Sequence, residues 1–379
     1  MAIESTRAQA HWCRGSGVEL FAEGDVYPRP RYNVPARQLE LFDLALIASG
    51  ETNGILKYMY DYVQPFGYET GYTDRHLAAA ELRRELFQAT AGKRAVGVRV
   101  VDVMHKVEGW QLPENAPEGV AHYLCRAGIE ITKTAKCLLT DNAIPTTYES
   151  IDAPLFIMGE NARHVTEQEL DCGAVLDAAA AVILTERGID VGLLSDEPDT
   201  ATGETYLKQG DTIKSLDGVR LMGLQCSTNA VVETVLTPTG TPGSYRYEND
   251  KGQRFFVIAA DLMRGDFVEA EQCPAYTSNY YRKTQLTAAI EYVGRSKMPV
   301  KTTAKCPNLY VIATESSDCS ALTVSVINPF IDDAADVKFE LGKQYSAVRF
   351  IGCSGSMSGD TITVQRIEPF GFAAFEVRQ

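Results

Sequence analysis

The sequence predicts a fold of class α/β plus β, in which α/β segments are followed by an antiparallel β-sandwich. Residues 1–95 follow the order strand, loop, helix twice, and residues 96–300 alternate apolar strands with helices. Residues 301–379 consist almost entirely of short apolar or alternating strands. Helices between apolar strands are typical of parallel sheets, and closely spaced short strands are typical of sandwiches. At about 150 residues per domain, 379 residues agree with two or three domains.

Two βα units are predicted in residues 1–95. Their first helix is indicated by Leu39, Phe42 and Leu46, which recur at helical spacing, and by Gly50, which is suited to end it. Such units place functional side chains in the loops after the strands, but two of them are too few to close a barrel. We therefore expect other units to complete it. The expected elements are the strand Gly17–Ala22, the helix Ala36–Ser49, the strand Gly54–Tyr60 and the helix Asp74–Gln88.

Residues 96–300 predict a Rossmann-like or flavodoxin-like α/β domain. No GxGxxG and no P-loop motif occurs, so nothing in the sequence directly supports nucleotide binding. Dense turn residues between β-branched runs predict a β-rich insertion at about residues 197–250. The expected strands are Val96–Val103, Leu155–Met158, Ile189–Leu194 and Arg254–Ala259, and the expected helices are Thr132–Asp141, Asp171–Arg187 and Tyr280–Val293.

Residues 301–379 predict a small antiparallel sandwich. Gly, Asn and Asp turns separate the apolar runs, and this spacing is typical of two packed sheets. The expected strands are Leu309–Ala313, Ala321–Ile327, Val337–Leu341, Ala347–Ile351, Thr361–Ile367 and Phe372–Val377.

The loop after the first strand contains the best candidate for chemistry, the carboxylate of Glu23. A carboxylate at the carboxyl end of a parallel strand suits acid-base or nucleophilic work, although an ion pair with Arg29 or Arg31 would be a purely structural role. Nearby acids and tyrosines are candidates for substrate contact, because sugar sites use carboxylates and aromatic surfaces, although core packing is the commoner role of a single tyrosine. These substrate-binding candidates are Asp25, Tyr27, Arg29, Tyr58, Asp61 and Glu69.

No metal or cofactor is expected. The five histidines show no HxH or HxxxH spacing, and His76 is interpreted as a polar anchor near the second loop. The segment Gly159–Ala162 follows a buried strand, where either ligand contact or a capping turn fits, and we favour the turn. The nine cysteines are odd in number and widely spaced without a CxxC motif, which favours reduced thiols in a cytoplasm.

Composition excludes several classes of function. The net charge of −14 disfavours nucleic-acid binding, which normally requires a basic surface. No run of about 18 apolar residues occurs, so no membrane span is expected. The first residues lack an apolar signal region, which also favours a cytoplasmic location.

The stretch FAEGDVYPRPRYNVPARQLELFDLALIASGETNGILKYMYDY resembles the last two units of the (β/α)8 barrel in large bacterial glycoside hydrolases, similar to the family-42 type β-galactosidases of clan A. Residues 96–300, with LFIMGENA and GAVLDAAAAVILTERGIDVGL, resemble the trimerisation domain of those enzymes, which is glutamine-amidotransferase-like without its catalytic cysteine. The run from MPVKTTAKCPNLY to IEPFGFAAFEV resembles their small C-terminal β domain. The resemblance covers nearly the whole chain and rests on domain order and several diffuse motifs.

This resemblance implies a retaining glycosidase, β-galactosidase-like, with Glu23 at the position of the nucleophile at the end of barrel strand seven; Glu19 is an earlier and weaker choice. Strand eight would be Gly54–Tyr60. Barrel strands one to six, and the acid/base glutamate with them, are not in this sequence. Because retaining hydrolysis needs two carboxyl groups about 5 Å apart, we expect the chain to act only with a partner that carries the rest of the barrel. The chain would then be either a natural split gene product or a truncated reading frame.

The resemblance also implies the partners of this chain. They are a carbohydrate substrate, a chain that completes the barrel, and further copies of this chain that associate through residues 96–300. The alternative is a non-catalytic accessory or oligomerisation subunit of a carbohydrate-active complex. An amidotransferase-like enzyme is disfavoured, because no cysteine lies in a Gly-x-Cys-x-Gly turn after a strand.

Overall fold

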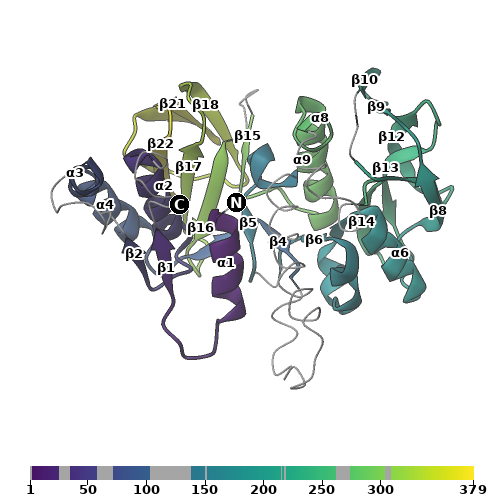
Figure 1. The fold of residues 1–379 in the computed structure, drawn as a ribbon, viewed down its shortest axis with the longest axis horizontal. Coiled ribbons are helices and arrows are strands. Elements are labelled where there is room, and N and C mark those ends of the chain that lie inside the picture. Colours follow the sequence, from purple (N-terminus) through teal and green to yellow (C-terminus); the bar gives the residue numbers. More distant parts are fainter. Residues whose placement is uncertain are drawn as a thin grey trace, which may run out of the picture. The chain divides into compact units, whose positions relative to one another are not determined.

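The computed structural model describes residues 2–24, 35–57, 71–102, 138–149, 152–214, 216, 219–261, 274–303 and 309–379. By contacts the chain divides into two compact units. Unit 1 comprises residues 1–96, 143–146 and 299–379, and unit 2 comprises residues 97–142 and 147–298. The first and last segments of the chain therefore fold together, with unit 2 inserted between them in sequence (Figure 1). No helix among these described ranges is long and apolar enough to cross a membrane.

The first part of unit 1 forms two βα units. Strands β1 and β2 pair in parallel, with Glu23 opposite Leu56. Helix α2 follows Pro35 and ends at Gly50, whose left-handed φ of 67° lets its N–H bond to Leu46; this helix is confirmed in both bounds. The elements are α1 (Ala2–Trp12), β1 (Phe21–Gly24), α2 (Ala36–Ser49), β2 (Gly54–Lys57), α3 (Gly71–Ala78), α4 (Ala80–Thr90) and β3 (Arg94–Val96).

The rest of unit 1 is a pair of antiparallel sheets, as expected for residues 301–379. One sheet has the order β15-β18-β21-β20, and the other has the order β19-β22-β17-β16-β3. Their facing sides enclose an apolar core that includes Val324, Phe339 and Phe375. The strands are β15 (Val300–Thr302), β16 (Tyr310–Glu315), β17 (Ala321–Asn328), β18 (Ala334–Leu341), β19 (Ala347–Ile351), β20 (Gly355–Ser358), β21 (Thr361–Ile367) and β22 (Gly371–Arg378).

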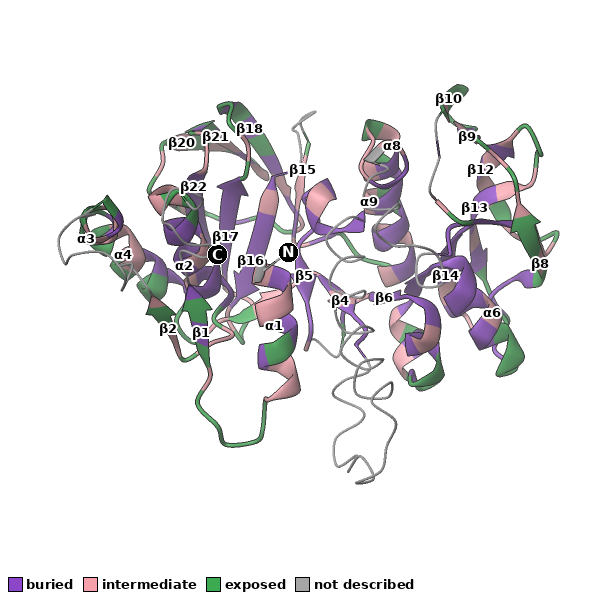
Figure 2. Cartoon of the chain, in the orientation of Figure 1, coloured by how far each residue is buried: buried purple, intermediate pink, exposed green. Residues whose placement is uncertain are grey.

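Helices α2 and α4 cover the outer face of the five-stranded sheet. Leu44 of α2 and Leu86 of α4 pack in one buried cluster with Ile312, Ile327 and Ile351 of the sheet. Figure 2 shows β16 and β17 as almost wholly buried strands, which agrees with their burial patterns. The helices of the βα units and the sandwich therefore share one core, and β1–β2 lies on the other side of α2.

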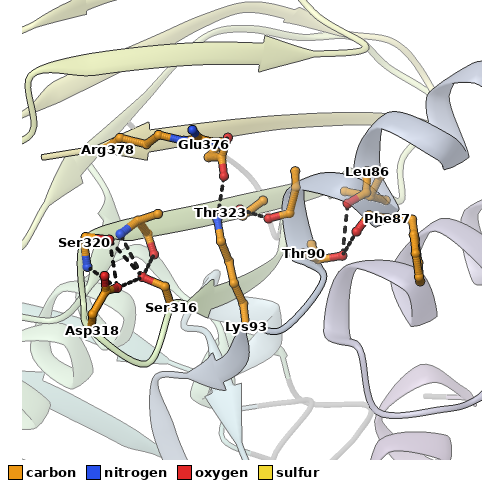
Figure 3. A network of polar contacts seen from close by, with 12 residues as sticks. Leu86, Phe87, Thr90, Lys93, Ser316, Asp318, Ser320, Thr323, Glu376 and Arg378 are labelled. Atoms are coloured by element: carbon orange, nitrogen blue, oxygen red, sulfur yellow. Dashed lines mark hydrogen bonds and ion pairs between the residues drawn. The ribbon is translucent and has the colours of Figure 1, made fainter.

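A buried cation fixes the segment after α4 to this sheet. Lys93 Nζ donates to Thr323 Oγ1 at 2.7 Å and to Glu376 Oε1 at 2.8 Å (Figure 3). Thr323 Oγ1 in turn donates to the carbonyl of Ala89. Burial acts to raise the pKa of Glu376, but the hydrogen bond and charge of Lys93, together with Arg378, hold it below its ordinary value.

Unit 2 is built on a mixed sheet of the order β10-β9-β12-β13-β14-β7-β6-β4-β5. The neighbours β14, β7, β6 and β4 run parallel, and the strands from β14 to β10 pair antiparallel. The β-rich insertion expected at 197–250 thus mostly extends the α/β sheet, apart from β8 and β11, which pair with each other in a separate two-stranded antiparallel sheet.

The described elements of unit 2, in chain order, are β4 (Val98–Val100), η3 (Thr140–Asn142), β5 (Thr146–Thr147), β6 (Leu155–Ile157), η4 (Gly159–Arg163), η5 (Glu169–Cys172), β7 (Ala174–Leu176), α6 (Ala178–Glu186), β8 (Leu193–Asp199), β9 (Gly203–Tyr206), β10 (Asp211–Lys214), β11 (Leu221–Cys226), β12 (Val231–Thr237), β13 (Pro242–Glu248), β14 (Arg254–Ile258), α8 (Pro274–Thr277) and α9 (Tyr280–Gly294). The chain enters unit 2 at residue 97, contributes residues 143–146 to unit 1, and enters unit 2 again at residue 147, within β5.

Some expected elements of residues 96–300 are wrong. The helix expected over Asp171–Arg187 is instead a 3₁₀ turn, strand β7 and the shorter helix α6, because Asp177 caps a new helix start. The strand expected over Val96–Val103 is interrupted at Gly97, whose φ is 145°. The strand expected over Ile189–Leu194 begins at Leu193, and most of Thr132–Asp141 lies outside the described residues.

Candidate functional site

Glu23 is the predicted site residue that the described part of the chain contains. It lies one residue before the carboxyl end of β1, and its side chain is exposed. The neighbouring strand β2 runs parallel, so both strands deliver their following loops to the same edge. The remaining candidates all follow β1 or β2 and lie outside the described residues: Asp25, Tyr27, Arg29, Tyr58, Asp61 and Glu69.

The two faces of the β1–β2 pair differ in what covers them. Ala22 and Gly24 are buried, and a Cβ atom on Gly24 would lie 3.0 Å from a leucine of α2. Phe21 and Glu23 point to the opposite face, where Phe21 is 53% exposed and Leu56, opposite Glu23, is 54% exposed. Among the described residues, α2 packs against the face of Ala22 and Gly24, and Glu23 lies on the opposite face.

A buried charge cluster lies on the helix-covered face, directly behind this carboxylate. Lys57 is the register partner of Gly24, and its Nζ lies 2.5 Å from Asp43 Oδ2 and 3.1 Å from Glu40 Oε2. His76 Nδ1 lies 3.3 Å from the same Nζ, and Arg83 donates to Glu40 Oε1 at 2.5 Å. The cluster connects the end of β2 to α2, α3 and α4, and so fixes the strand end from which the second loop departs.

The geometry of this cluster does not favour a metal ion. Ligand atoms of Glu40, Asp43 and His76 lie within 4.8 Å of one another, which is close enough for a shared cation. However, the ammonium of Lys57 already lies within hydrogen-bond distance of all three. Burial raises the pKa of Asp43, and burial followed by the charge of Arg83 lowers the pKa of His76.

Of this cluster, only His76 is singled out from the sequence, as a polar anchor. One signal was present in the sequence. Lys57 has the same strand parity as Ile55 and faces α2, where the acids Glu40 and Asp43 lie one turn apart. A lysine on the helix-covered side of a parallel strand needs a buried acid as its partner.

In unit 2 the candidate region after β6 is a capping turn. Asp177 Oδ1 accepts hydrogen bonds from Gly159 N at 2.9 Å and from Ala180 N at 2.8 Å. The side-chain amide of Asn161 donates to the carbonyl of Met158. These polar groups hold the ends of β6 and β7 together, in agreement with the favoured interpretation of Gly159–Ala162.

A second buried ion pair, Arg282 with Glu204, joins α9 to β9 in unit 2. The two side chains are 0% and 1% exposed. Thr234 donates to Glu204 at 2.6 Å, and Arg282 donates to Gln285 at 2.5 Å and lies over the ring of Tyr276. Burial acts to lower the pKa of Arg282, but the carboxylate of Glu204 holds it above its ordinary value. Because both side chains are buried and hydrogen-bonded to their neighbours, we interpret this ion pair as structural.

No family model and no curated protein matches the chain. Solved structures of glycoside hydrolases are similar to it in fold. The α-L-fucosidase isoenzyme 2 from Paenibacillus thiaminolyticus matches with a TM-score of 0.65 and 11% identity, over 98% of this chain and 62% of that one. This chain thus spans about three fifths of the length of that enzyme.

Two further glycosidases match less well. A β-galactosidase from the haloarchaeon Halorubrum lacusprofundi has a TM-score of 0.44 and 11% identity, over 93% of this chain and 51% of that one. An exo-carrageenase of family GH42 from Bacteroides ovatus has a TM-score of 0.37 and 12% identity, over 92% and 39%. The fold likeness over most of this chain rests on the fucosidase.

Proposed function

We propose that the chain is the part of a retaining glycoside hydrolase that carries the last two βα units of the catalytic barrel, with Glu23 as the nucleophile. In this proposal residues 1–95 belong to the barrel, residues 96–300 form the amidotransferase-like domain, and residues 301–379 form the small β domain. The acid/base carboxyl group comes from the part of the barrel that contains the other six units, which is either the partner chain of a split enzyme or the remainder of a longer protein. The substrate is a neutral glycoside, a β-galactoside by the sequence resemblance or an α-L-fucoside by analogy with the similar structure.

The observation that supports this proposal best is the position of Glu23. Its carboxylate is exposed near the carboxyl end of a parallel strand, on the face opposite the one that packs on α2. The similar fucosidase adds support. The match covers 98% of this chain but only 62% of the fucosidase, so the proposed further βα units correspond to the unmatched part of that enzyme. The exposed Phe21 and Leu56 beside Glu23 suit a face that other strands cover.

For retaining hydrolysis this chain supplies one carboxylate, Glu23, and the structure that holds it in place. Glu23 attacks the anomeric carbon and forms a glycosyl ester while the acid/base residue of the other barrel units protonates the leaving oxygen. Water, activated by the same residue as a base, then cleaves the ester and releases the sugar. The Lys57 cluster keeps the ends of β1 and β2 fixed against α2 during both steps.

The test is co-expression of this chain with the product of the adjacent upstream reading frame, assayed with nitrophenyl β-D-galactoside and nitrophenyl α-L-fucoside. We expect hydrolysis by the pair and a loss of at least about a thousandfold in Glu23→Gln, because the covalent step is removed. Glu19→Gln is the matched control, since Glu19 is also exposed but precedes the strand. Its activity should equal that of the wild type.

A second measurement addresses the covalent step directly. A 2-deoxy-2-fluoro glycoside of the hydrolysed sugar should label the wild-type chain at the peptide that contains Glu23, as seen by mass spectrometry. Absence of hydrolysis by the pair, or an unimpaired Glu23→Gln variant, would contradict the proposal.

The alternative is a non-catalytic oligomerisation subunit, and exposed apolar side chains of unit 2 favour it. Leu194 and Val231 are 69% and 54% exposed. In that case sedimentation of this chain alone should give a stable oligomer, and charged substitutions at these two residues should dissociate it. The proposed homo-oligomer through residues 96–300 is compatible with both functions.

A further inference from the structure

Unit 1 contains a cavity of about 420 Å³ between helices α2, α3 and α4 and strands β21 and β22. Leu41 and Leu44 are the leucines of α2 that line it, whereas Leu39 faces β1. The cavity is therefore separate from the face that carries Glu23. Its volume lies within the range of roughly 300–1,000 Å³ that is usual for small-molecule sites.

One wall of this cavity is rich in guanidinium groups. Arg37, Arg75 and Arg366 all line it. Two of them are neutralised: Arg37 donates to Glu368 at 2.5 Å, and Arg366 donates to Asp333 at 2.9 Å. The third, Arg75 on α3, has no such acidic partner among the described residues.

Arg75 has a buried Nε atom that finds no hydrogen-bond partner among the described residues. A buried donor without an acceptor destabilises the folded state unless something else satisfies it. The acid of the lining on α2, Glu40, already accepts from Lys57 and Arg83. The other acid of the lining, Glu368, accepts from Arg37. Both acids are therefore paired with other cations, and the guanidinium of Arg75 remains as a positive group of the cavity.

The remaining lining determines what kind of anion fits. Gln365 and Ser354 add polar groups, and Leu82 and Phe372 add apolar surface. A guanidinium presents a planar fork that matches the two oxygens of a carboxylate, and an apolar wall suits the body of a sugar ring. The net charge of −14 would repel a free anion from most of the surface, so binding requires such a local cation.

We infer that this cavity binds an acidic monosaccharide, with its carboxylate on Arg75 and its ring against Leu82 and Phe372. Such a site is a secondary carbohydrate site of the chain. It does not rest on the nucleophile role of Glu23, because the two lie on different sides of α2.

The test is isothermal titration of the full chain with D-glucuronate, D-glucose and inorganic sulfate, in low-salt buffer. We expect glucuronate to bind at one site and to raise the thermal midpoint, while glucose does not bind detectably. Sulfate should bind at least about tenfold more weakly than glucuronate, since it lacks the ring that contacts the apolar wall.

Variants separate the site from the rest of the surface. Arg75→Ala should weaken glucuronate binding at least about tenfold, and Arg75→Lys should weaken it less, because a point charge replaces the fork. Arg84→Ala is the matched control, since Arg84 lies on the exposed side of α4, paired with Glu81. Its binding should be unchanged. Thermal midpoints without ligand report whether each variant folds.

Three results would overturn the inference. They are no binding of glucuronate to the wild type, equal binding by a folded Arg75→Ala variant, and sulfate binding as tight as that of glucuronate. The last result would leave an inorganic oxyanion site in place of a carbohydrate site.

Discussion

Replacing Lys57 by Met should destabilise unit 1 far more than replacing an exposed cation. Lys57 is 8% exposed, and its partners Glu40 and Asp43 are 1% and 3% exposed. Removing it leaves Asp43 without its hydrogen-bonded cation, although Glu40 keeps Arg83. Removal of one partner from a buried ion pair costs about 3–5 kcal/mol, so Lys57→Met should lower the free energy of unfolding by an amount in this range.

The cost should depend on pH in a direction that the structure fixes. Burial already raises the pKa of Asp43, and without Lys57 it rises further. A carboxyl group whose pKa is higher in the folded state destabilises it above that pKa and ceases to do so as the pH falls through it. Lys57→Met should therefore approach the wild type in stability in mild acid, and the double variant Asp43→Asn with Lys57→Met should recover part of the loss at pH 7.

Urea unfolding followed by tryptophan fluorescence and circular dichroism measures both effects. Arg84→Met is the control, because Arg84 and Glu81 are 66% and 61% exposed and such pairs contribute less than about 1 kcal/mol. If Lys57→Met cost no more than Arg84→Met, or the same at every pH, the reasoning from burial would be refuted.

Other variants test further parts of the structure. Glu204→Gln and Arg282→Met should each cost about 3–5 kcal/mol in urea unfolding, and their combination should cost less than the sum, because the buried pair is removed as a whole; additive costs would contradict this coupling. Glu376 has a lowered pKa, so it stabilises the fold above its ordinary pKa of 4.5 and the contribution is lost as the pH falls through the folded-state value. The stability of Glu376→Gln should accordingly fall less steeply with decreasing pH than that of the wild type. Parallel acid titrations followed by circular dichroism would show this difference. Gly173→Ala should lower the thermal midpoint, since a Cβ atom would lie 2.2 Å from the carbonyl oxygen of Val293; an unchanged midpoint would mean that this contact relaxes freely.

Elements with a strong local pattern could be predicted from the sequence. Helix α2 has apolar residues at helical spacing and a glycine at its end, and both bounds agree. The strands Ala347–Ile351 and Thr361–Ile367 also agree in both bounds. In each case the residues that define the pattern also make the contacts, so local information suffices.

Two kinds of feature could not be predicted from the sequence: element boundaries inside an alanine-rich run, and side-chain clusters that form only through tertiary contacts. The run GAVLDAAAAVILTER has no polar face, so the three residues of β7 and the start of α6 look alike, and only Asp177 marks the change. The Lys57 cluster needs the register of β1 on β2 and the packing of α2 before its members meet. The role of Glu23 stays a prediction, because the loop residues that would accompany it lie outside the described ranges.

The position of β22 has a consequence for how the chain folds as it is synthesised. Residues 371–378 pair with β17 on one side and β19 on the other, so they form an interior strand of the five-stranded sheet. All of unit 2 leaves the ribosome before them and can fold first. Until β22 is synthesised, the five-stranded sheet that packs against α2 and α4 is incomplete. Ile312 and Ile327 then stay exposed and can form non-native contacts. Shortening the chain by this one strand should therefore yield a protein that chaperones retain.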